Sequence, residues 1–440
     1  MSHSHTRRRL RIAGATAGVL AVAACGTSGG TSSGGGGGSI KGGPGIDLTA
    51  KTITVGILTP LSGPVAIIGK PLTSGMEAWF DHVNDSGGLN GFKINFKDNE
   101  KDNLYTPTKH SQLYSQIQPN VAMIAQSLGS PTTAAIEQQA VSDNILLGTA
   151  AQDSEFVLDV HNINIGSPYN IDDVNSIDYI VNKLGKKDAK IGVIYQNDSY
   201  GKPALKGVEA GLSANGLTAV DEEPYNQTDT SFQGQIVKLH QSGATYVVAI
   251  MIPTAAGTAV GTAAAAHYFP QWVFQGPAWS EYLMTKDGTA AGAQTPLFPI
   301  LSGTVAPGVP PVLVMGDSPT WGDTSVSGMA GFLADQQKYF PAQAPDYYYL
   351  YGYCMAQAET AILKKAISMG DLSRAGILAA KEATGTVDFG GLYPPVTYSS
   401  TPGPGTRMSG LAQVDASTPG FLKSVQPAYQ SDVAKNLPMP

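Results

Sequence analysis

The chain has 440 residues, of which 42% are hydrophobic and 14% charged, so it is long enough for two or three domains with a sizeable core. Its formal net charge is -7, although the first 24 residues carry four arginines and no acidic residue. The remaining chain is therefore more acidic than the total suggests. This balance argues against nucleic-acid binding, because basic surface supplies most of the affinity for phosphate backbones.

The N-terminus has the pattern of an export signal over residues 1–24. Basic residues at 7–11 precede the 13 apolar residues 12–24, a run that is too short to span a bilayer. The sequence VAAC at 22–25 resembles the bacterial lipobox, which predicts cleavage before Cys25 and lipidation of its thiol. The alternative is an ordinary signal cleavage that leaves Cys25 a free thiol. Residues 6–10 also resemble a twin-arginine signal, so the export route is either Sec or twin-arginine.

A glycine- and serine-rich stretch follows the cysteine and predicts a flexible tether over residues 25–48. Together with a lipidated Cys25 it would hold the body at the outer face of the cytoplasmic membrane. Two G-x-S-x-G matches inside the tether lack the flanking strand and helix that a nucleophile elbow requires.

The body alternates apolar runs of strand length with helical patterns. A Ser-Pro pair at 130–131 predicts a helix start, with Ser130 as the N-cap residue. Such alternation indicates parallel sheets covered by helices, and ligands bind beyond the carboxyl ends of such strands. Strands are expected at 53–58, 92–96, 121–125, 145–148, 190–195, 246–251 and 272–276, and helices at 72–83, 201–215, 229–242 and 345–367.

Motifs for common chemistries are absent from the sequence. Gly63 to Lys70 has one residue too many for a phosphate-binding loop, and Pro71 replaces the Ser or Thr that would bind magnesium. The seven histidines lack metal-ligand spacing, and no nucleophile-base-acid trio is apparent. We therefore expect no metal, no cofactor and no enzymatic activity.

Seven segments carry a family resemblance, and they keep the family's order along the chain. In this order they resemble the type I periplasmic binding proteins, specifically the branched-chain amino acid-binding (Leu/Ile/Val) subfamily that feeds ABC importers. The segments are GILTPLSGPVAIIG, GGLNGFKINFKDNE, GSPTTAAIEQQAVSDNILLGTAA, AKIGVIYQNDSYGKPALKGVEAGL, DTSFQGQIVKLHQSGATYVVA, QWVFQGPAW and YLYGYCMAQAETAI.

The resemblance implies an α/β fold of two Rossmann-like lobes with parallel sheets, joined by three hinge crossovers. The crossovers are expected near residues 167, 318 and 388. Lobe 1 would comprise residues 49–167 plus 318–388, and lobe 2 would comprise residues 168–317 plus 389–440.

Four residues match positions of the family's ligand site. Ser130 matches the position that receives the ligand carboxylate, although it could instead be a plain helix cap. Ala151 and Asp153 match the loop that offers oxygen atoms to the ligand ammonium, and Asp153 could equally be an ordinary loop acid. Tyr200 matches a tyrosine that lines the cleft from the second lobe, or it could simply be packed at the lobe surface.

Three positions depart from the pattern of the amino acid binders. Ile68 lies where an aromatic residue usually covers the ligand, Ile252 where a tyrosine is usual, and Ala278 where an acid usually pairs with the ammonium. The second-lobe wall is therefore expected to be more apolar than an amino-acid site.

The loss of that acid bears on the ligand. A buried ammonium without a partner costs several kcal/mol, so an α-amino acid is expected to bind poorly unless Asp153 or Glu281 replaces the acid. Trp279 could add apolar or stacking surface. We expect a ligand with a carboxylate or polar head and an uncharged body, not a standard branched-chain amino acid.

The predicted function is that of a lipid-anchored, monomeric binding protein that delivers a small organic solute to the permease subunits of an ABC importer. A sensor of the same architecture that reports to a receptor is the alternative. An exported α/β hydrolase is a third reading, which requires a titratable cluster in the cleft.

Overall fold

The computed structural model describes residues 40–439. The predicted signal peptide, Cys25 and most of the predicted tether lie outside the described residues. The end of the expected tether is already part of the fold, because Lys41 forms a bridge with Asp371 and β1 (Ile46–Asp47) pairs with β2 (Thr52–Thr59). Within residues 40–439, no helix is long and apolar enough to cross a membrane.

The first sheet is centred on β2 and has the strand order β1-β2-β5-β6-β7, with β3 and β4 also paired to β2. All pairings in it are parallel except that of β1. Helices connect the parallel strands, as such crossovers require. The further elements are β3 (Lys93–Asn95), β4 (Glu100–Asp102), β5 (Met123–Leu128), β6 (Leu147–Ala150), β7 (Asn162–Ile163), α1 (Ala66–Asp85), α2 (Pro107–Ile117), α3 (Ser130–Ala134) and α4 (Glu137–Ser142).

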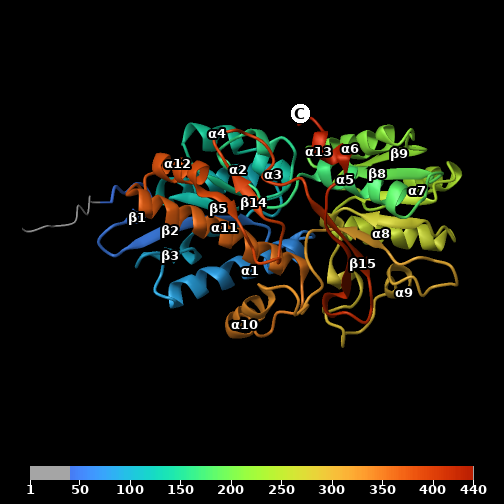
Figure 1. The fold of residues 1–440 in the computed structure, drawn as a ribbon. Coiled ribbons are helices and arrows are strands. Elements are labelled where there is room, and N and C mark those ends of the chain that lie inside the picture. The colour runs from blue at the N-terminus through green and yellow to red at the C-terminus, as the bar shows by residue number, and fades with distance from the viewer. Residues whose placement is uncertain (1–39, 440) are drawn as a thin grey trace, which may run out of the picture. The chain divides into compact units, whose positions relative to one another are not determined.

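The second sheet has the order β16-β15-β12-β11-β10-β8-β9 and is drawn beside the first in Figure 1. Its five strands from β9 to β12 are parallel, and β15 and β16 add an antiparallel edge. Its elements are α5 (Tyr169–Asp178), β8 (Ile191–Gln196), α6 (Gly201–Ala214), β9 (Asp221–Tyr225), α7 (Gln233–Gln241), β10 (Tyr246–Ile250), α8 (Pro253–Ala265), β11 (Gln271–Phe274), α9 (Phe298–Leu301), β12 (Leu313–Met315), β15 (Ser409–Val414), β16 (Leu422–Tyr429) and α13 (Asp432–Asn436). The predicted α/β class with two mainly parallel sheets is confirmed.

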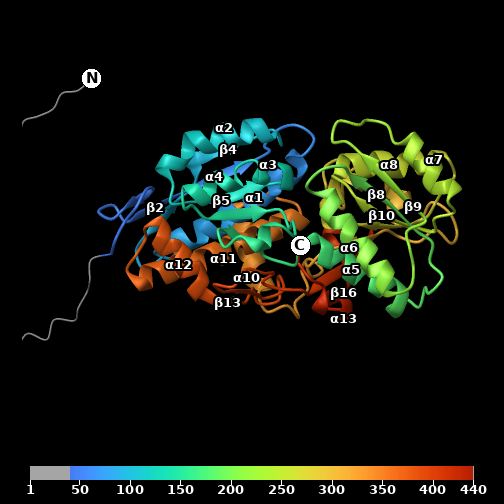
Figure 2. The same ribbon diagram turned by 90° about the horizontal axis from the view of Figure 1, so that it is seen from above.

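The chain passes between the two sheets three times. It leaves the first sheet after β7, and after β12 it returns to α10 (Met329–Tyr339), α11 (Tyr347–Met369) and α12 (Arg374–Thr384), which pack on the first-sheet side (Figure 2). The third passage comes later than the expected residue 388. β13 (Gly385–Val387) pairs with β14 (Val396–Tyr398), and β14 contacts α12, so the return to the second sheet falls between β14 and β15.

Helix α11 has well-defined ends that fix its position. The Asp346 carboxylate caps its N-terminus, accepting hydrogen bonds from the amides of Tyr348 at 2.8 Å and Tyr349 at 3.0 Å. Gly370 ends the helix in a left-handed conformation at φ 75°. Helix α11 packs along α1, and the first turns of α11 lie beside the N-terminal half of α1.

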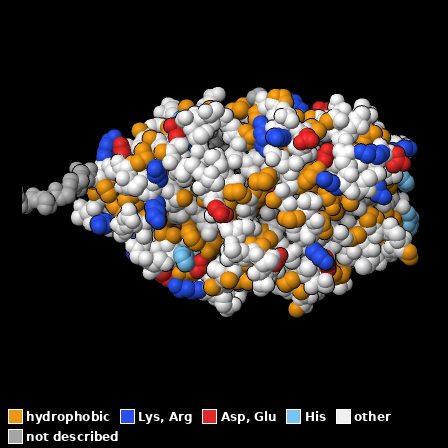
Figure 3. Space-filling model, in the orientation of Figure 1, with side chains coloured by type: hydrophobic (Ala, Val, Ile, Leu, Met, Phe, Trp, Pro, Cys, Tyr) orange, Lys and Arg blue, Asp and Glu red, His pale blue; other side chains and the backbone are white. Residues whose placement is uncertain are grey.

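Charged side chains of both signs are scattered over the face drawn in Figure 3, and lysine and arginine do not gather into a continuous stripe there.

Candidate functional site

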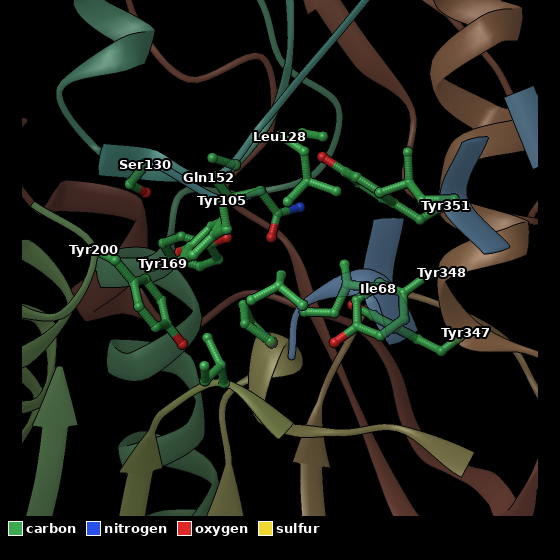
Figure 4. A pocket seen from close by; sticks show the side chains of 17 residues that line it. Ile68, Tyr105, Leu128, Ser130, Gln152, Tyr169, Tyr200, Tyr347, Tyr348 and Tyr351 are labelled. Carbon is green, nitrogen blue, oxygen red and sulfur yellow. The ribbon is translucent and has the colours of Figure 1, made fainter. Parts of the chain in front are cut away.

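A cavity lies at the carboxyl ends of strands from both sheets and encloses about 590 Å³, including the part open to solvent. That size is within the range of small-molecule sites. Among the residues that the structure describes, no charged side chain lines the cavity. Six of its lining residues are tyrosines, contributed by the loop after β4 (Tyr105), the starts of α5 and α6 (Tyr169 and Tyr200) and α11 (Tyr347, Tyr348 and Tyr351). Figure 4 shows Ser130, Gln152 and Tyr200 on one side of this space and the α11 tyrosines on the other.

Five of the residues singled out from the sequence line this cavity. They come from α1, α3, the loops after β6 and β10, and the start of α6, which bring strand ends and helix starts together. They are Ile68, Ser130, Ala151, Tyr200 and Ile252.

Three others lie outside the lining. Asp153, in the loop after β6, is buried but does not line the cavity. Ala278 and Trp279 are fully buried, and the short turn at Gly276–Ala278 presents Pro277 to the cavity instead. The Trp279 indole donates to Glu281 Oε1 at 3.4 Å, so its ring packs in the core of the second lobe rather than against the cavity.

Ser130 is not the N-cap residue that the sequence predicted. The N-cap is Gly129 at φ 101°, and Ser130 is the first residue of the five-residue helix α3. A Cβ at position 129 would lie 2.3 Å from the ring of Tyr105, so only glycine fits there. The Ser130 hydroxyl is thereby freed from capping. It is buried, it lines the cavity, and it has no hydrogen-bond partner among the described residues.

Asp153 belongs to the loop that follows β6. It accepts a hydrogen bond from the Glu155 amide at 3.0 Å. Burial raises the pKa of Asp153 to about 7, and the hydrogen bond from the Glu155 amide and the nearby Ser130 hydroxyl only partly oppose the shift. Ser130 and Asp153 are thus neighbours, although their side chains do not form a hydrogen bond of normal geometry. The group is therefore only partly ionised near neutral pH, which makes it a weak counter-ion for a ligand ammonium.

The carboxylate of Glu281 is also hydrogen-bonded within the protein. Its Oε1 accepts from the Tyr347 amide at 2.8 Å as well as from Trp279. It lines a different cavity of about 410 Å³ together with Asp346. Neither acid considered from the sequence therefore stands in the lining in place of Ala278.

The tyrosines of α11 are the part of the site that the sequence patterns missed. Tyr348 donates to the carbonyl oxygens of Trp279 at 2.9 Å and Gly276 at 3.2 Å, which ties α11 to a loop of the second lobe. Burial raises the pKa of the hydroxyls of Tyr347, Tyr348 and Tyr351 well above their usual value, so they remain protonated. Their i, i+1, i+4 spacing was the available signal, since it places them on neighbouring faces of one helix.

Gln152 adds an amide to the lining. Its Nε2 donates to the Ile165 carbonyl at 3.1 Å and contacts the Tyr393 hydroxyl at 3.3 Å. With the Ser130 hydroxyl, the site offers amide and hydroxyl groups among apolar and aromatic surfaces. Within residues 40–439, no cluster of three or more His, Cys, Asp or Glu side chains could hold a metal ion.

Two α/β lobes with a solute-sized cavity between strand ends define a class of binding proteins. A model of the periplasmic binding protein family matches residues 52–419, and the chain belongs to this family. The type I fold implied by the resemblance is thereby confirmed. The family name places its members outside the cytoplasm.

Curated relatives are similar over part of the chain. The Leu/Ile/Val-binding protein homolog 3 of Brucella melitensis is 26% identical over 200 residues, covering 44% of this chain and 53% of the relative. The homolog 7 of Brucella abortus is 29% identical over 206 residues, covering 44% and 51%. The matched part thus spans about half the length of these relatives.

Solved structures match over nearly the whole chain. A fatty acid ABC transporter substrate-binding protein from Thermomonospora curvata is 25% identical with a TM-score of 0.82, covering 91% of this chain and 97% of that chain. A solute-binding protein from R. palustris in complex with benzoate is 18% identical with a TM-score of 0.69, covering 87% and 98%. A branched-chain amino acid ABC transporter protein from Thermus thermophilus with bound valine is 13% identical with a TM-score of 0.73, covering 87% and 98%. The last two show the shared fold.

Proposed function

We propose that this protein is the lipid-anchored, extracytoplasmic substrate-binding component of an ABC importer, and that it captures a small organic acid with an apolar body. The observation that carries this proposal is the cavity between the lobes. It is apolar and aromatic, and it holds two buried hydroxyls, those of Ser130 and Tyr351, with no partner in the described protein. A buried polar group without a partner costs free energy unless a ligand or water satisfies it.

The polar head of the ligand is assigned to Ser130 and its neighbourhood. Pro131 has no amide hydrogen, and the Thr133 amide donates to the Gly129 carbonyl at 2.9 Å. The donors assigned to a ligand carboxylate are therefore the hydroxyl and amide of Ser130. The body of the ligand would contact Ile68 from the first lobe and Ile252 from the second, both of which line the cavity. The α11 tyrosines offer ring faces to an acyl chain or an aromatic ring.

A monocarboxylic acid fits this lining better than an amino acid does. An amino acid brings an ammonium group, and no carboxylate lines the cavity to receive it. The relatives whose names mention a fatty acid and benzoate support this choice. The valine-bound relative is more distant in sequence, at 13% identity.

Binding would proceed by hinge closure. The first lobe and α11 supply most of the lining, whereas Tyr169, Tyr200, Ile252 and Pro277 come from the second. A ligand held on the first lobe gains the contacts of the second only when the lobes approach, so it favours the closed arrangement. The closed protein, acting as a monomer anchored through Cys25, would then present its ligand to the permease subunits.

Native mass spectrometry of protein purified from its own cells tests the proposed function. We expect a co-purifying organic acid at one copy per chain. Ala151→Trp fills the cavity from a buried lining position and should abolish the adduct, whereas Ala214→Trp, on the exposed end of α6, should retain it. An adduct that survives in the Ala151→Trp variant would place the ligand elsewhere.

A further inference from the structure

Two buried carboxyl groups join the three passages between the lobes. Asp172, in the first turn of α5, accepts hydrogen bonds from the hydroxyls of Ser167 in the first passage and Ser409 in the third, the latter at 2.7 Å. Asp317, in the second passage, accepts from the Gly410 amide of the third passage at 2.9 Å. The two acids therefore connect all three segments that must move when the lobes open.

The acids also act on each other. The charge of Asp317 is, after burial, the main cause that raises the pKa of Asp172 well above its usual value. Burial raises the pKa of Asp317 to about 7 despite its hydrogen bonds from the protein. Asp172 and Asp317 bond to the adjacent residues Ser409 and Gly410, so the two acids belong to one buried cluster, and interacting acids in such a cluster resist ionising together.

No cation compensates this pair. The other titratable groups that face it are Asp173, which adds a further acid on α5, and the hydroxyls of Tyr347, Tyr351 and Tyr393. Arg407 lies close in sequence to the third passage, but its guanidinium donates to the carbonyls of Ala434 and Leu437, both at 2.8 Å. Within residues 40–439, no ion pair includes either carboxyl group.

A chain of neighbouring side chains connects the pair to the cavity. Gln152 lines the cavity and contacts the Tyr393 hydroxyl at 3.3 Å. The Tyr393 hydroxyl lowers the pKa of Asp317 relative to burial alone. A Cβ on Gly166 would lie within 3 Å of Gln152, Tyr393 and Asp317 together, so these three side chains are neighbours. A change in the cavity wall is thus transmitted to the hinge through one side chain, Tyr393.

We propose that Asp172 and Asp317 form a proton-linked hinge, in which the closed arrangement holds one shared proton and opening releases it, and that Tyr393 is the positioning residue that couples this hinge to the occupied cavity. The coupling to the cavity rests on the proposed binding function, whereas the proton linkage of the hinge does not. Opening would separate the passages and admit water to the carboxyl groups, which would then ionise like ordinary aspartates. As the pH rises from about 4 to about 7, the ratio of closed to open protein should fall by up to tenfold per pH unit.

Small-angle scattering of the ligand-free protein between pH 5 and pH 8 tests the hinge. The radius of gyration should increase with pH in the wild type. Replacing both acids, Asp172→Asn together with Asp317→Asn, keeps oxygen acceptors for Ser167, Ser409 and Gly410 but leaves neither group able to ionise, so this double variant should remain compact at every pH. Asp323→Asn is the matched control, since this partly exposed acid follows on the same loop and its carboxylate bonds only to Ser325. It should behave like the wild type.

A wild-type curve that does not change with pH, or a double variant that expands like the wild type, would overturn the hinge proposal. Should the double variant fail to fold by circular dichroism, each single variant should expand over a narrower pH range than the wild type, because the remaining acid lacks the charge of the other. A wild-type response in both single variants would then overturn the proposal.

Calorimetry tests the coupling, with benzoate and decanoate as probes in two buffers of different ionisation enthalpy at pH 7. Binding to the wild type should take up protons, and Tyr393→Phe should reduce this uptake while retaining the pH-dependent scattering. Equal proton uptake in both proteins would refute the coupling. Failure of both probes to bind would count against the proposed ligand class, and the scattering result would still decide the hinge.

Discussion

Gly75 of α1 and Gly352 of α11 lie where the two helices cross, and the lack of a side chain at both positions lets the two backbones approach closely. A Cβ on Gly75 would lie 1.9 Å from the carbonyl oxygen of Tyr349, and a Cβ on Gly352 would lie 1.9 Å from that of Leu72. This close approach brings Ile68 on α1 and the α11 tyrosines to the same cavity. The binding site therefore depends on two glycines that do not line it.

Alanine at either glycine should force the helices apart. We expect Gly352→Ala to lower the free energy of unfolding by about 1 to 3 kcal/mol, as overpacking does, and to weaken ligand binding by displacing the α11 tyrosines. Gly331→Ala in α10 is the matched control, because a Cβ there meets nothing within 4 Å. It should be neutral or slightly stabilising, as denaturant unfolding of both variants would show.

Ser130→Ala should separate binding from stability. Because the hydroxyl has no partner in the described protein, its loss should leave the melting temperature unchanged. A hydrogen bond to a charged ligand group is worth about 1.5 to 3 kcal/mol, so the affinity should fall about 10- to 100-fold.

Ser127→Ala is the contrasting variant. Its hydroxyl bonds to Thr133 at 2.7 Å and to His110 at 3.0 Å, so its loss should lower stability instead. Titration and thermal melts of both variants provide the check, and a destabilised Ser130→Ala protein with unchanged affinity would contradict the assignment.

Much of the architecture was predictable because it rests on local patterns. Alternating apolar runs and helical periodicities identified seven of the strands, namely β2, β3, β5, β6, β8, β10 and β11. Parallel strands necessarily collect their carboxyl ends at one edge, which explains why Ser130 and Ala151, which follow neighbouring strands, both line the cavity.

The sequence did not predict the remaining features of the site, because they depend on long-range packing or on a single backbone angle. Tyr348 enters the site from a helix that follows the second sheet in the chain, and its partner carbonyls could not be inferred from spacing. The positive φ of Gly129 moved the helix start by one residue, so Ser130 faces the cavity rather than capping. A short turn at Gly276–Ala278 directed Trp279 into the core.

Tyr348 and Tyr351 form a second matched pair for mutation. Tyr348→Phe leaves the buried Trp279 carbonyl without its donor, which should lower the free energy of unfolding by about 1 to 3 kcal/mol, whereas the Gly276 carbonyl still accepts from the Trp279 amide. The Tyr351 hydroxyl is buried with no partner in the described protein, so Tyr351→Phe should cost little or nothing. Equal losses in the two variants, measured by denaturant unfolding, would mean that the contact between α11 and the second lobe contributes nothing.

His110 should make the free energy of unfolding fall as the pH is lowered. Burial lowers the pKa of this histidine to about 3, so it is neutral in the folded protein. Unfolding lets it take up a proton below its ordinary pKa near 6.5, and the stability it contributes is therefore present above that pH and lost as the pH falls toward 3. The slope from this one group should approach 1.4 kcal/mol per pH unit.

Urea unfolding from pH 7 to pH 4 measures that slope. His110→Gln should be less stable at pH 7, because it loses contacts with Asn103 and Ser127, but should lose less stability on acidification. The exposed His267 offers a control, and His267→Gln should keep the wild-type slope. Identical slopes in the His110→Gln and wild-type proteins would contradict the buried neutral state.

Cys25 should determine where the protein resides in the cell. If its thiol is lipidated, Cys25→Ser should move the protein out of the membrane fraction without changing its affinity for ligand. Fractionation of cells expressing each form measures this, and a wild-type protein that is absent from membranes would favour ordinary signal cleavage.

Isothermal titration with leucine, isoleucine and valine on one side, and benzoate and decanoate on the other, tests the nature of the site most directly. A cavity without a charged lining residue predicts binding of a monocarboxylic acid at one copy per chain and weak or undetectable binding of the three amino acids. Tight binding of leucine, with no response to either acid, would contradict it.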